Sequence, residues 1–179
     1  MNSMSKNYCY DDHDRCKHDD HCYCRKEKKP CPTIIKCNCP SSTTIPAIPT
    51  GTSNFTISSL TLNTSCLCDP CIKLEFASNV TISADFTGTI NFQVFKLCKN
   101  QLNPIPVGPS WTLSIPAATG SIISLPLAFF VCDCDNCGDD CCTYTVVATN
   151  TTVIVGSVTL GNTTLGAIAT CNSNNCCYN

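Results

Sequence analysis

The stretch IKLEFASNVTISADFTGTINFQVFKLC, residues 72–98, decides the fold class of this chain. Apolar and polar residues alternate from Ile72 to Phe86, and a second apolar run, Ile90 to Leu97, follows Gly88. A period of two places every other side chain on the same face of a β-strand, whereas an amphipathic helix needs a period of 3.6. The stretch therefore predicts consecutive β-strands separated by a turn.

The same pattern continues outward over residues 51–172. Short apolar or alternating runs begin near Phe55, Trp111, Ile122, Tyr144 and Val153, with turn residues between them. Eight or nine short strands with regular turn signals are typical of an antiparallel sandwich or jelly roll. No segment has a helical period worth naming. We therefore expect an all-β protein, an antiparallel jelly-roll-like β-sandwich with an extended N-terminal cysteine-rich arm.

The first part of the chain differs in composition. Residues 1–40 contain 14 of the 24 charged residues and all three His, and almost no apolar residue precedes Ile34. Such a segment cannot bury enough apolar surface to fold alone, so it is expected to be a flexible Cys/His-rich connector arm. Residues 41–50 (SSTTIPAIPT) contain two prolines and are interpreted as a linker. The β domain then spans 51–172, and 173–179 is a Cys-containing tail.

The composition narrows the class of protein. Nineteen of the 179 residues are cysteine, a density typical of a disulfide scaffold or a metal-cluster protein. Because the number is odd, at least one thiol stays free, binds a metal or pairs with another chain. The net charge of −2 offers no basic surface for nucleic acid and little resistance to self-association. No apolar run is long enough for a transmembrane helix, so no membrane partner is expected.

The cysteines also bear on location. Disulfides persist in oxidising surroundings, yet the first 30 residues contain no apolar core of a secretory signal. A protein made in a cell that later lyses reconciles the two observations, and a bacterial spore formed inside a mother cell fits it. We therefore expect localisation on a bacterial spore surface, which becomes extracellular after mother-cell lysis.

The cysteines fall into two groups. Candidates for inter-subunit disulfides lie in the arm: Cys9, Cys16, Cys22, Cys24, Cys31, Cys37 and Cys39. Disulfide candidates of the β domain and tail, most of them in loops, are Cys66, Cys68, Cys71, Cys98, Cys132, Cys134, Cys137, Cys141, Cys142, Cys171, Cys176 and Cys177. The last three arm cysteines directly precede the first strand and are expected to link to near neighbours. The partners expected to receive the arm are Cys98, Cys171, Cys176 and Cys177.

Metal binding and intrachain bridges alone remain alternatives. CxC and CxxC spacings can bind Zn²⁺, and His13, His18 and His21 lie among the arm cysteines. However, no paired CxxC frame with zinc-finger spacing occurs, so neither a metal nor another cofactor is predicted. An enzyme is not expected either. Every His lies in the arm, and the chain has no GxSxG, P-loop or GxGxxG motif.

Four segments resemble a known family. TLNTSCLCDPCIKLEF (61–76), INFQVFKLC (90–98) with NPIPVGPSW (103–111), FFVCDCDNCGDDCCTYTVV (129–147) and LGAIATCN (165–172) look like the cysteine-rich proteins of clostridial spore-formers that share one domain of unassigned function. The resemblance covers roughly residues 33–172. That family is similar to the subunits of Bacillus endospore appendages, which are jelly rolls with a flexible N-terminal connector. The resemblance implies fibres in which subunits add strands to each other's sheets and connector cysteines form disulfides further along the fibre.

These observations together predict a structural subunit. We expect it to self-assemble into disulfide-cross-linked, pilus-like fibres on a spore surface, with copies of itself and other spore-surface proteins as partners. An uncovered sheet edge is a template for another chain, and a heterologous contact that does not close gives a filament. The alternatives are a cross-linked coat or exosporium lattice protein and a thiol metal-binding module. The long charged arm departs from the Bacillus pattern and leaves a bulk, tip or anchoring role open.

Overall fold

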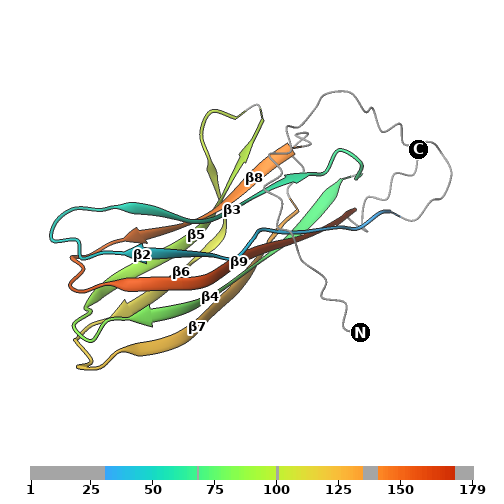
Figure 1. The fold of residues 1–179 in the computed structure, drawn as a ribbon. Coiled ribbons are helices and arrows are strands. Elements are labelled where there is room, and N and C mark those ends of the chain that lie inside the picture. The colour runs from blue at the N-terminus through green and yellow to red at the C-terminus, as the bar shows by residue number, and fades with distance from the viewer. Residues whose placement is uncertain (1–30, 68, 100, 135–140, 172–179) are drawn as a thin grey trace, which may run out of the picture.

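The computed structural model describes residues 31–67, 69–99, 101–134 and 141–171, which form two antiparallel sheets packed as a sandwich (Figure 1). These residues contain nine strands: β1 (Ile34–Cys37), β2 (Ser41–Ile45), β3 (Asn54–Asn63), β4 (Pro70–Ile82), β5 (Gly88–Cys98), β6 (Ile105–Ile115), β7 (Ile123–Asp133), β8 (Cys141–Asn150) and β9 (Val158–Cys171). The predicted fold class is confirmed. The predicted arm up to residue 30 and the tail from 172 lie outside the described residues.

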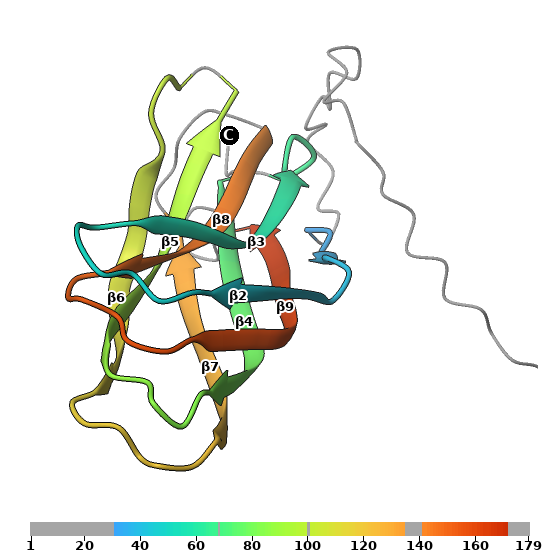
Figure 2. The same ribbon diagram turned by 60° about the vertical axis from the view of Figure 1, so that its left-hand side comes forward.

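Each sheet combines strands that are distant in sequence. The five-stranded sheet has the order β1-β9-β4-β7, with β2 also pairing with β9. The four-stranded sheet has the order β3-β8-β5-β6. Figure 2 shows the two layers from a second direction. Five strands therefore have a single paired neighbour at a sheet edge in the described part of the chain: β1, β2 and β7 in one sheet, β3 and β6 in the other.

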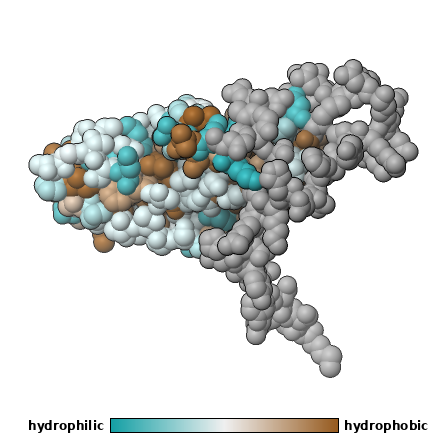
Figure 3. All heavy atoms as spheres, turned by 90° about the horizontal axis from the view of Figure 1, so that it is seen from above, coloured by the Kyte–Doolittle hydropathy of each residue, from teal (hydrophilic) through white to brown (hydrophobic). Residues whose placement is uncertain are grey.

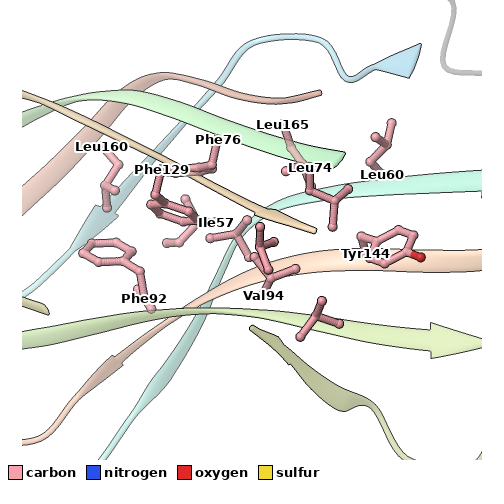
Figure 4. Close-up of a cluster of buried hydrophobic side chains, with 14 of the residues drawn as sticks. Ile57, Leu60, Leu74, Phe76, Phe92, Val94, Phe129, Tyr144, Leu160 and Leu165 are labelled. Atoms are coloured by element: carbon pink, nitrogen blue, oxygen red, sulfur yellow. The ribbon is translucent and has the colours of Figure 1, made fainter. Parts of the chain in front are cut away.

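The core forms from the alternation seen in the sequence. Along β4, Leu74 and Phe76 are buried while Lys73 and Glu75 are exposed. The inward rows of both sheets meet in one hydrophobic cluster, part of which is shown in Figure 4. Burying a large apolar side chain stabilises the fold by roughly 1.5–3 kcal/mol, so these rows hold the two sheets together.

Aromatic stacking closes the side of the sandwich where β6 faces β7. Trp111 on β6 stacks on Phe129 of β7 with ring centroids 4.0 Å apart. Phe129 also stacks on Phe76 of β4 at 4.8 Å. Offset or stacked aromatic pairs add about 0.5–1.5 kcal/mol beyond the burial of their area. The stack therefore ties the edge strand of each sheet to the interior.

The structure corrects the predicted boundary between arm, linker and domain. The segments interpreted as the end of the arm and as a linker contain β1 and β2, both paired with β9. Ile45 is only 1 % exposed, because it enters the core just before Pro46 ends the strand. Both strands lie at the sheet margin, where proline and a missing neighbour are tolerated. The same reason explains why β6 and β7 accommodate Pro109 and Pro126.

Gly108 offers a test of how closely the two edge strands approach. Its φ is +67°, and a Cβ there would collide with the side chain of Val131. Gly108→Ala should therefore lower the free energy of unfolding by about 2–4 kcal/mol, from strain and overpacking together. Gly51→Ala, with a similar φ of +82° and open space around it, is the matched control and should cost about 1 kcal/mol. Chemical denaturation measures the free energy of unfolding of both variants. An equal loss in the two would contradict the close contact between Gly108 and Val131.

Candidate functional site

The described cysteines gather toward one end of the sandwich, called here the cysteine end. β4 and β8 begin there, and β5, β7 and β9 end there (Figure 1). The loops of the opposite end span residues 46–53, 83–87, 116–122 and 151–157, and they contain no cysteine. Thiol chemistry in the described part of the chain is therefore confined to one pole of the domain and to the sheet surface beside it.

Three intrachain disulfides, each between two cysteines of the described residues, reinforce the cysteine end. Cys31–Cys171 ties the segment before β1 to the end of β9, with a Cα–Cα distance of 6.0 Å. Cys71–Cys134 joins the start of β4 to the residue after β7 at 4.1 Å, and Cys98–Cys142 joins β5 to β8 at 4.0 Å. Each of these bridges links strands of the same sheet. Each contributes about 2–4 kcal/mol by restricting the unfolded chain.

Two of these bridges correct the predicted roles of their cysteines. Cys31 was expected to link to another subunit, and Cys98 and Cys171 were expected to receive an arm. Instead, Cys31 pairs with Cys171 and Cys98 with Cys142 within one chain. The physical reason is antiparallel pairing, which places the start of β1 beside the end of β9 and puts β5 beside β8. Cysteines on adjacent strands are then within disulfide distance.

Two free thiols lie on the outer surface of the five-stranded sheet. Cys37 on β1 and Cys132 on β7 are exposed and make no disulfide. Both strands lie at an edge of that sheet. Cys39 and Cys66 are also exposed, and Cys141 is disulfide-bonded. The remaining candidates lie outside the described residues, so their roles stay predictions: Cys9, Cys16, Cys22, Cys24, Cys68, Cys137, Cys176 and Cys177.

Apolar and charged side chains share this outer surface with the thiols. Ile35 next to Cys37 is 71 % exposed, and Phe130 next to Cys132 on the same face is 62 % exposed. Between them on β4, Lys73 Nζ lies 2.5 Å from Glu75 Oε1 and 5.2 Å from the centre of the Phe130 ring. The hydrogen bond and charge of Glu75 raise the pKa of Lys73, and Cys132 adds to the effect. The surface therefore offers apolar contact beside a fixed cation.

Few strong charges cover the rest of the molecule. Figure 3 shows one side, on which hydrophobic residues interrupt a pale, weakly polar surface. Only 13 % of the chain is charged. A surface of this kind opposes self-association weakly.

The interior of the cysteine end holds a polar cluster that the sequence reading missed. Lys96 Nζ lies 2.8 Å from Asp133 Oδ2, and the hydroxyl of Tyr144 donates a hydrogen bond of 2.6 Å to the same oxygen. Lys96 is 4 %, Asp133 5 % and Tyr144 0 % exposed. The available signal was the row Val94, Lys96, Cys98, in which a charged residue occupies an inward position of the alternation.

Residues 31–67, 69–99, 101–134 and 141–171 contain no group of three or more His, Cys, Asp or Glu arranged to hold a metal ion. The same ranges contain no helix that is long and apolar enough to cross a membrane.

The two classes of cysteine should differ in reactivity. In monomeric protein that has not been reduced, a maleimide should label Cys37 and Cys132, because each is an exposed thiol. Cys98 and Cys142 should be labelled only after reduction and unfolding, because they are bonded and buried. Peptide mass spectrometry measures the labelled fraction of each cysteine before and after reduction. Labelling of Cys98 before reduction, or protection of Cys132, would contradict the arrangement.

Two solved structures are distantly similar to this chain. The enzymatically active domain of bacteriophage CBA120 tailspike protein 4 is 13 % identical with a TM-score of 0.34, over 74 % of this chain and 19 % of that chain. A chain of infectious bursal disease virus Gx strain is 9 % identical with a TM-score of 0.30, over 78 % of this chain and 39 % of that one. The chain thus spans well under half of each, and no curated protein matches it. The family described as "Domain of unknown function (DUF4489)" matches residues 31–170, and the chain belongs to that family.

Proposed function

We propose that this protein is a structural subunit that self-assembles into disulfide-cross-linked fibres on a bacterial spore surface. The observation that supports it best is the position of the free thiols. Cys37 and Cys132 are exposed, and each lies on an edge strand of the five-stranded sheet. A neighbour that pairs with the β7 edge is brought beside the Cys132 thiol, so strand pairing and cross-linking act at one place.

Strand pairing between subunits needs long edges with free backbone groups. β3 has ten residues and no proline, and β7 has eleven residues with one proline. By contrast, β6 contains Pro106 and Pro109, and β1 has only four residues. Unpaired edges of this length are templates for another strand. We therefore assign the contact to β3 of one copy and β7 of the next.

This contact would build a filament because its two surfaces differ. β3 lies in the four-stranded sheet and β7 in the five-stranded sheet. An interface between two different patches is heterologous, and repetition of such an interface gives either a ring or an open helix. A surface with few charges lets copies approach each other closely.

Disulfides then make the assembly resistant to dissociation. The donors in this proposal are the arm cysteines Cys9, Cys16, Cys22 and Cys24, and the receivers are Cys37 and Cys132. The receivers differ from those expected from the sequence, because Cys98 and Cys171 are already paired within the chain. The spore surface is proposed from the resemblance to endospore appendage subunits and from the oxidising surroundings that disulfides need.

The pairing step can be tested on the free edge of β7. A proline in an edge strand directs its missing N–H toward solvent, and Ala128 has the same orientation as Pro126 two residues earlier. Ala128→Pro should therefore leave the β4–β7 ladder intact and abolish filaments in negative-stain electron microscopy. Ala118→Pro, in the exposed loop before β7, is the matched control and should assemble normally. Filaments from a folded Ala128→Pro variant would exclude this edge, and flat lattices from the wild type would favour a coat protein.

The cross-linking step has a separate readout. Boiled wild-type fibres should give a ladder of multimers in non-reducing electrophoresis and a single monomer band after reduction. The double variant Cys37→Ser/Cys132→Ser should still form filaments, because the edges are unchanged, but should lose at least tenfold of its boiling-resistant multimers. Ser65→Ala, a small change at a half-buried turn residue after β3, is a control without effect. A full ladder from the double variant would assign the receiving thiols elsewhere.

A further inference from the structure

The buried cluster of Lys96, Asp133 and Tyr144 has a composition unlike the rest of the core. A charged amine and a carboxylate are both removed from water, which costs free energy even when they pair. Replacing such a pair by apolar residues is often neutral or stabilising, so a buried ion pair by itself is weak evidence for a stabilising role. A contribution to stability therefore does not explain why these charged residues are buried together, and a chemical reaction between them would.

We propose that Lys96 and Asp133 form an intramolecular amide (isopeptide) bond. Lys96 Nζ is the nucleophile, and it lies 2.8 Å from Asp133 Oδ2, an oxygen bonded to the carbon under attack. Fixing two reacting groups in contact can replace a large part of the entropic barrier to bond formation. Both side chains are about 5 % exposed, so water, the reagent of the reverse reaction, is excluded.

The step balances without an oxidant, a reductant or a co-reactant. The Lys96 ammonium passes one proton to the Asp133 carboxylate, and the resulting amine attacks the carboxyl carbon. The new C–N bond forms, the C–OH bond breaks, and a second proton from the nitrogen leaves with the hydroxyl as water. Tyr144 donates its hydroxyl hydrogen bond to Asp133 Oδ2 and stabilises the charge on that oxygen in the tetrahedral intermediate.

The amide bond would lie between the two sheets, where it would resist their separation. Lys96 and Tyr144 lie opposite each other on β5 and β8 of the four-stranded sheet, while Asp133 belongs to β7 of the five-stranded sheet. The bridges Cys31–Cys171, Cys71–Cys134 and Cys98–Cys142 each stay within one sheet. The amide would instead join the two sheets covalently, and it would survive reducing conditions that open the disulfides. The inference stands independently of fibre assembly.

Mass spectrometry of the full-length wild-type chain tests the proposal directly. After complete reduction, alkylation and denaturation, the intact mass should be lower by one water molecule than the mass calculated for the fully alkylated sequence. Digestion with trypsin and chymotrypsin should yield a branched peptide that contains both Lys96 and Asp133, with no cleavage after Lys96. The exposed pair Lys73–Glu75 is an internal control that should lose no water. A mass equal to that of the fully alkylated sequence, with Lys96 and Asp133 in separate peptides, would overturn the proposal.

Two variants assign the roles within the cluster. Lys96→Arg keeps the positive charge but lacks the amine, so its mass should equal that of its own sequence. A loss of water in this variant would place the reaction elsewhere and contradict the proposal. Tyr144→Phe keeps the ring in the core, and its dehydrated fraction should fall at least severalfold at a fixed time after synthesis. Complete dehydration of Tyr144→Phe would refute the part given to its hydroxyl.

Discussion

The period of two along each strand controls both the inside and the outside of this sandwich. Val131 and Asp133 point into the core, so Cys132 between them must face solvent. Val94 and Cys98 point into the core as well, so Lys96 between them must also be buried. One geometric rule therefore places a reactive thiol on the surface and a charge in the interior. A register slip of one residue would exchange these roles and expose the hydrophobic rows.

The two ends of the domain are stabilised by different chemistry. At the cysteine end, three disulfides between described cysteines join neighbouring strands. At the opposite end, Asn150 is 1 % exposed, accepts a hydrogen bond from the Ser53 N–H and donates to the carbonyls of Gly51 and Thr152. A buried amide with its partners satisfied orders a loop without covalent bonds. Cross-linking is thus concentrated at one pole, an asymmetry that suits a subunit joined head to tail.

Much of the fold could be predicted because strand patterning is local. The alternation that begins at Ile72 and the apolar run after Gly88 become β4 and β5. The predictions fail where contacts with strands distant in sequence determine the local structure. Prolines argued against a strand in residues 41–50, but Ile45 is buried against β9 and β2 needs no second neighbour. The loose alternation after Phe55 reflects a register shift between Thr56 and Ser58.

The sequence by itself determined the class of fold, the concentration of cysteines and the low surface charge, because all three follow from composition and local pattern. Only the tertiary structure decided which cysteines meet. Cys31 and Cys171 are 140 residues apart in sequence and become neighbours through the pairing of β1 with β9. The contact of Lys96 with Asp133 likewise needs two sheets to pack face to face. Such contacts depend on the order of strands, which short-range patterns do not encode.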